Sequence, residues 1–148
     1  MSLSYDVFTG AFLSKVTEYD FPIKDYEHNS MIDGFMKRAI SSFQKVCKYD
    51  LTATADDLVR EFSIDVAIED SEEIADIVSE GMIAQWLKPY VYKQENLENI
   101  LNTRDFSGYS PAELLSKVSA AHKDAKWTFT QMQREYSYNH GDLSDLHL

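Results

Sequence analysis

Apolar residues recur at spacings of three and four over most of the chain, which is the pattern of amphipathic helices. The first run follows Ser4, a residue type that caps helix N-termini, and is expected to end near Tyr19. A polar turn at 24–29 leads into a second run from Met31 to Cys47. The N-terminal third therefore predicts two helices, each with one apolar face.

The next stretch gives a mixed signal. Leu58, Val59 and Phe62 suggest a short helical turn. Residues 63–69 then alternate apolar and polar, which is the period of a strand. A single strand at 63–69 has no evident partner to pair with. We therefore favour a segment without a strand, and the strand stays an open alternative.

A third helix is expected to begin after a cap at Asp70 or Ser71, with acidic residues in its first turn, where the helix dipole favours them. Pro89 should end or kink this helix, because proline removes a backbone donor and clashes with the preceding turn. A separate helix is expected to resume from Tyr90 to Leu101. The apolar stripe predicted for the third helix is Ile74, Ile77, Val78, Met82, Ile83, Trp86 and Leu87.

The clearest helix start lies in the last third. Ser110 is a capping residue, Pro111 occupies the first helical position, and Glu113 follows three residues after the cap. The helix should continue for about seven turns, or roughly 40 Å. Its expected stripe is Leu114, Val118, Ala121, Ala125, Phe129, Met132 and Tyr136. His122 and Trp127 fall beside or off this stripe, so another subunit is a candidate to cover that side.

A short polar tail at 139–148 follows the last helix. It is either a frayed end or a docking peptide that carries Leu143, Leu146 and Leu148. Burying each leucine contributes about 1.5–3 kcal/mol, whereas fixing each residue of the tail costs about 1–2 kcal/mol. One tail binds marginally, but many tails on one ring act at high effective concentration. A functional tail therefore implies an oligomer.

Composition agrees with a helical fold. The 148 residues are 44% hydrophobic, enough for one folded domain. Five Gly and three Pro are few for a sheet-rich chain. We therefore predict an all-α fold: a bundle of about four to five helices at 1–138, with a long C-terminal helix and an extended docking tail at 139–148.

The net charge of −11 is concentrated in one quarter of the chain, where residues 56–80 hold ten acids and a single base, Arg60. Such a surface lacks the Lys/Arg footprint of a phosphate-backbone binder, although it could face nucleic acid while repelling it. No run is long enough to span a membrane, and the N-terminus does not resemble a signal peptide, so a cytoplasmic origin is expected.

Candidate chemistry is sparse. Four acids at helical spacing could hold a metal, but no His stands three residues after any Glu among them, so a solvated face is favoured. These acids are Glu72, Glu73, Asp76 and Glu80. Cys47 is expected as a small buried hydrophobe, Gly34 as a close helix contact, and His122 as a surface or interface histidine. With no catalytic motif present, no enzyme activity and no cofactor are expected.

Several stretches resemble a family of small virion proteins from tailed bacteriophages of Gram-positive hosts, and are most similar to the neck proteins, the head-to-tail connectors or adaptors. The resemblance spans nearly the whole chain. It lies in residues 5–8, 12–21, 80–89, 101–106, 109–112, 136–139 and 141–143, including Gly81-Met82-Ile83-Ala84-Gln85-Trp86-Leu87 and Tyr136-Ser137-Tyr138-Asn139.

The resemblance implies a helical adaptor that forms a ring, commonly of twelve copies, beneath the portal and around the DNA channel. It would contact the portal through its C-terminal extension, meet a downstream neck or tail-completion protein, and reside in the virion neck. DNA would pass without specific binding. The implied docking residues are Tyr136, Tyr138, Leu143, Leu146 and Leu148, and the possible channel-facing acids are Asp70, Glu72, Glu73, Asp76 and Glu80.

Two other functions stay open. An acidic phage protein that mimics DNA and inhibits a nucleic-acid enzyme would use the acidic quarter as its binding face. A small helical enzyme is the third candidate, although no residue pattern supports it.

Overall fold

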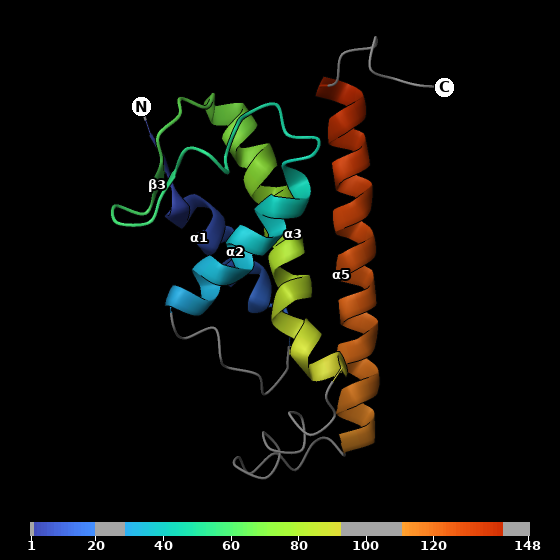
Figure 1. Cartoon of the computed structure of the whole chain (residues 1–148). Coiled ribbons are helices and arrows are strands. Elements are labelled where there is room, and N and C mark those ends of the chain that lie inside the picture. Colours follow the sequence, from blue (N-terminus) through green and yellow to red (C-terminus); the bar gives the residue numbers. More distant parts are fainter. Residues whose placement is uncertain (1, 20–28, 93–110, 141–148) are drawn as a thin grey trace.

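The computed structural model describes residues 2–19, 29–92 and 111–140 (Figure 1). Helices dominate this part of the chain, and the predicted all-α fold with a long C-terminal helix is confirmed. The helices are α1 (Tyr5–Val16), α2 (Asn29–Phe43), α3 (Ile68–Tyr92) and α5 (Pro111–His140). Three two-residue strands, β1 (Leu3–Ser4), β2 (Ala55–Asp56) and β3 (Glu61–Phe62), form a small antiparallel sheet in the order β1-β3-β2.

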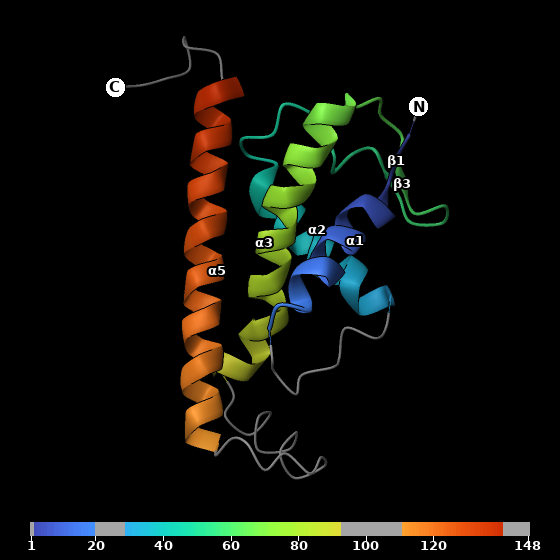
Figure 2. The same ribbon diagram turned by 180° about the vertical axis from the view of Figure 1, so that it is seen from behind.

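Helix α3 is the centre of the molecule. It packs against α1 and α2 on one side and against α5 on the other, as both views show (Figures 1 and 2). A helix buried from several sides must be apolar over most of its circumference. All seven residues of its predicted stripe are buried, and so are Ala75, Ser79, Gly81, Ala84 and Tyr90.

The N-terminal cap of α1 is confirmed, because the Ser4 side chain accepts a hydrogen bond from the Asp6 N–H at 3.1 Å. The second helix is shorter than expected. It ends at Phe43, so Cys47 lies in the following loop and is half-buried. The reason is Gln44, whose side-chain carbonyl accepts from the Leu51 N–H at 2.8 Å and folds this loop back.

The short helical turn predicted around Leu58 and Val59 is wrong. These residues form the exposed turn between β2 and β3, and Phe62 is a buried strand residue. Arg60 has a positive φ of 55°, a conformation that helices do not use. Its guanidinium fixes the turn through ion pairs at 2.8 Å to Asp33 of α2 and at 2.9 Å to Asp6 of α1.

Both ends of α3 differ from expectation. The helix begins at Ile68, and the Ser71 N–H bonds to the Ala67 carbonyl, so Asp70 and Ser71 lie within the first turn and do not cap it. No strand extends over 63–69, because pairing stops at Phe62.

At the other end, Pro89 does not end the helix, which continues to Tyr92, although the ribbon changes direction near this end (Figure 1). Tyr90 and Val91 therefore belong to α3 and not to a separate helix. The remainder of that predicted helix, through Leu101, and the Ser110 cap lie outside the described residues.

Helix α5 lies against α3 along an apolar stripe that matches the prediction. Leu114, Val118, Ala125, Phe129 and Tyr136 are buried, and Ala121 and Met132 are half-buried. The glycine that permits close approach is Gly81, not Gly34. A Cβ at Gly81 would lie 2.8 Å from the Phe129 ring and 2.9 Å from the Ala39 Cβ, whereas nothing lies within 4 Å of one at Gly34.

Within these described ranges, no helix is long and apolar enough to cross a lipid bilayer.

Candidate docking surface

Tyr136 belongs to the core of this chain, which corrects its assignment as a docking residue. Its side chain is 2% exposed, and its ring lies edge-on to Phe43 at 4.9 Å between centroids. Its hydroxyl accepts a hydrogen bond from the Lys48 N–H at 3.2 Å. Burial raises the pKa of this phenol well above its ordinary value. Tyr136 therefore joins the end of α5 to the loop after α2.

Tyr138, two residues further on, is available to a partner. It is 75% exposed on the last turn of α5. Trp127, three turns earlier on the same helix, is 65% exposed. Large aromatic side chains are enriched at protein interfaces, because they bury much area with few rotatable bonds. The two residues make the solvent side of α5 the candidate docking surface.

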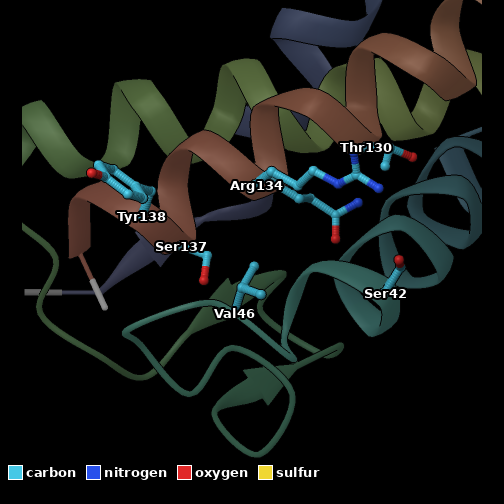
Figure 3. Close-up of a pocket in the computed structure, with 7 residues that line it drawn as sticks. Ser42, Val46, Thr130, Arg134, Ser137 and Tyr138 are labelled. Atoms are coloured by element: carbon cyan, nitrogen blue, oxygen red, sulfur yellow. The ribbon is translucent and has the colours of Figure 1, made fainter. Parts of the chain in front are cut away.

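An open groove of about 420 Å³ runs beside Tyr138, between the C-terminal end of α5 and the C-terminal end of α2 (Figure 3). In Figure 3, Ser137 of α5 points toward Val46, and Ser42 of α2 lies across from Thr130. The groove is lined by Ser42, Val46, Thr130, Gln133, Arg134, Ser137 and Tyr138. Its lining combines an apolar floor with hydroxyl, amide and guanidinium groups, which suits a peptide segment. Leu143, Leu146 and Leu148, the other expected docking residues, lie outside the described residues.

Lysines from outside α3 hold three of the five candidate channel-facing acids. Lys15 of α1 bonds to Asp76 at 2.7 Å and Glu80 at 3.0 Å, and Lys48 bonds to Asp70 at 3.3 Å.

Asp70 also accepts a hydrogen bond from the Tyr49 hydroxyl, which raises the pKa of that phenol. Glu72 and Glu73 are exposed on the first turns of α3, and Asp76 is exposed despite its ion pair. The acids of α3 thus combine ion pairs within the chain with an exposed acidic surface.

A second hollow of about 240 Å³ shares Ser42, Thr130 and Gln133 with the first and continues it along α5. Its lining includes three cations from three helices: Arg38 of α2, Lys88 of α3 and Lys126 of α5. No local sequence motif predicts this cluster, because the three residues are far apart in the sequence. We call the hollow the cationic groove.

His122 lies at the cationic groove and is buried, with 9% exposure, so its assignment as a surface histidine is corrected. Its ring is edge-on to Tyr92 at 6.1 Å between centroids, under the last turn of α3. Burial, followed by the charges of Lys126 and Lys88, lowers the pKa of the imidazole. The histidine is therefore neutral near pH 7 and serves as a packing residue.

Burial also raises the pKa of the Cys47 thiol, which disfavours its reactive thiolate form. In the ranges that the structure covers, no three His, Cys, Asp or Glu side chains gather as a metal site.

Comparison with protein-family models, with curated proteins and with solved structures finds no match for this chain.

Proposed function

We propose that this chain is a virion structural protein, a head-to-tail adaptor whose copies form a ring, with twelve as the expected number, beneath the portal of a tailed phage. The observation that carries the proposal is the exposed side of α5. This helix lies at the edge of the molecule and packs mainly on α3, so it presents Trp127 and Tyr138 outward. The helix then leads directly into the tail at 139–148. The sequence resemblance to neck proteins is the basis for proposing the portal as the partner.

The shape and charge of the chain support the same assignment. A 30-residue helix is about 45 Å long at 1.5 Å per residue, and so offers an extended edge to neighbours. An exposed acidic surface would repel DNA in a channel and let it pass. In this proposal Asp70, Asp76 and Glu80 are the weaker candidates to face the lumen, because lysines engage them.

The same ion pairs disfavour the alternative of a DNA mimic. Such an inhibitor needs a continuous row of carboxylates that a partner's cations can reach. Lys15, Lys37 and Lys48 already form ion pairs with four of the ten acids of the acidic quarter, which are Asp57, Asp70, Asp76 and Glu80.

The decisive experiment mixes the purified chain with the portal ring of the same phage. We compare the full chain with a chain truncated after Tyr138 and with a full-length variant carrying Leu143→Ala, Leu146→Ala and Leu148→Ala. The full chain should join the portal as a ring visible by electron microscopy. Both altered chains should fold, judged by circular dichroism, and fail to join.

A full chain that does not bind the portal would refute the adaptor assignment. If the truncated chain bound the portal as well as the full chain did, the adaptor assignment would be supported and the docking role of the tail would be refuted. Tyr138→Ala separates the contribution of the exposed ring from that of the tail.

A further inference from the structure

The cationic groove is a concentration of unneutralised positive charge on a chain of net charge −11. Lys88 and Lys126 are exposed, as is Arg38. In the described part of the chain, none of these three side chains forms an ion pair, although Lys15, Lys37, Lys48 and Arg60 all do. The cations that stabilise the fold are thus a different set from those that line the groove.

The groove has the electrostatics of an anion-binding surface. Its cations come from α2, α3 and α5, so the fold itself brings them together. The lowered pKa of His122 is consistent with this positive electrostatic field, because the charges of Lys126 and Lys88 lower that pKa in addition to burial. Positive charge that the chain leaves unpaired favours an acidic partner.

A complementary surface lies at the opposite end of α3. Glu69 and Glu72 are exposed there, and neither forms an ion pair in the ranges described. Sixteen residues separate Glu72 from Lys88, or about 24 Å along the helix. Because the Debye length is about 8 Å at physiological salt, the two ends of one copy do not neutralise each other. Each end is therefore available to a partner of opposite charge from outside the copy.

We propose that the cationic groove receives the acidic N-terminal end of α3 from a second copy of this chain. This inference deepens the proposed function and rests on it, because it names the contact between neighbouring subunits of the ring. The two surfaces differ, so the contact is head-to-tail. Head-to-tail contacts generate closed rings when the rotation closes, whereas two identical faces would give a two-fold dimer.

Charge reversal tests this pairing with two variants of the full chain. The groove variant carries Lys88→Glu and Lys126→Glu, and the acid variant carries Glu69→Lys and Glu72→Lys. The control carries Lys45→Glu and Lys123→Glu, at exposed positions that do not line the groove. It has the same change in net charge as the groove variant. Circular dichroism checks that every variant folds. Sedimentation velocity at low salt measures self-association.

The wild type and the control should self-associate at low salt and dissociate as salt rises. The groove variant alone should associate at least tenfold more weakly, because acid then faces acid, and the acid variant alone should do the same. An equimolar mixture of the two should recover association, since each groove again meets an end of opposite charge.

A wild-type chain that stays monomeric at low salt would overturn the inference, and so would a mixture that fails to recover. The portal experiment separates this failure from that of the adaptor. If the groove and acid variants joined the portal as complete rings, the pairing would be wrong while the adaptor assignment stood. If the wild type did not bind the portal, the adaptor assignment would fall by itself.

Discussion

Gly81 is the residue on which the contact of α3 with α5 depends most directly. A methyl group there would meet the Phe129 ring at 2.8 Å and the Ala39 Cβ at 2.9 Å. We predict that Gly81→Ala lowers the free energy of unfolding by about 1–2 kcal/mol. Overpacking costs about 1–3 kcal/mol, and alanine's better helix propensity offsets up to about 1 kcal/mol of that. Urea titration measures the change.

Gly34→Ala is the matched control, because nothing lies within 4 Å of the added methyl group. It should raise the free energy of unfolding by about 0.5–1 kcal/mol through helix propensity alone. If both substitutions changed stability in the same direction, the close approach of α3 and α5 at Gly81 would be wrong.

His122 gives the fold a pH dependence. Burial and the nearby charges of Lys126 and Lys88 lower its pKa in the folded state, so the folded chain binds the proton less readily than the unfolded chain. The stability that the neutral imidazole contributes is present above the unfolded pKa of about 6.5 and is lost as pH falls toward the lower folded value. We predict that the wild type loses stability between pH 7.5 and 5.5 relative to His122→Gln.

Arg38 lines the same hollow, so each of the three helices around the hollow contributes a cation to its lining. The comparison with His122→Gln cancels the contribution of the carboxylates, which titrate in both proteins. Urea titrations of both proteins at the two pH values give the difference. A difference that does not change with pH would contradict a lowered pKa for His122.

At the scale of secondary-structure elements, the periodicity of apolar residues predicted the helices because each helix buries residues at spacings of three and four. The stripes of α3 and α5 are confirmed almost residue by residue. The boundaries depend on contacts that no local pattern contains. Helix α2 stops at Phe43, where Gln44 binds the backbone of a loop that returns to it. Phe62 pairs with Leu3, which lies near the start of the chain.

The candidate surfaces show the same division between local and distant information. Tyr138 lies on the last turn of α5, beyond the apolar stripe that ends at Tyr136, so its exposure is consistent with the sequence. The ion pairs of Asp70, Asp76 and Glu80 depend on Lys15 and Lys48, which come from elsewhere in the chain. The cationic groove combines residues of three helices, and only their assembly creates it.

At the scale of the whole molecule, the expected boundary between a folded domain at 1–138 and a tail at 139–148 can be measured. Tyr136 is the last buried residue of the part described. We predict that truncation after Tyr138 changes the free energy of unfolding by less than about 0.5 kcal/mol, as surface changes usually do. Truncation after Glu135 should cost about 3–5 kcal/mol, the range for removing a large buried aromatic side chain.

The larger loss has a specific origin. Removing Tyr136 leaves Phe43 without its edge-on partner and the Lys48 N–H without its acceptor. Tyr136→Ala in the full chain distinguishes this loss from fraying of a shortened helix, and should reproduce most of it. Urea titrations of the three variants provide the measurement. Equal stability of the two truncated chains would show that the fold does not depend on Tyr136, whereas a large loss on truncation after Tyr138 would make 139–148 part of the domain.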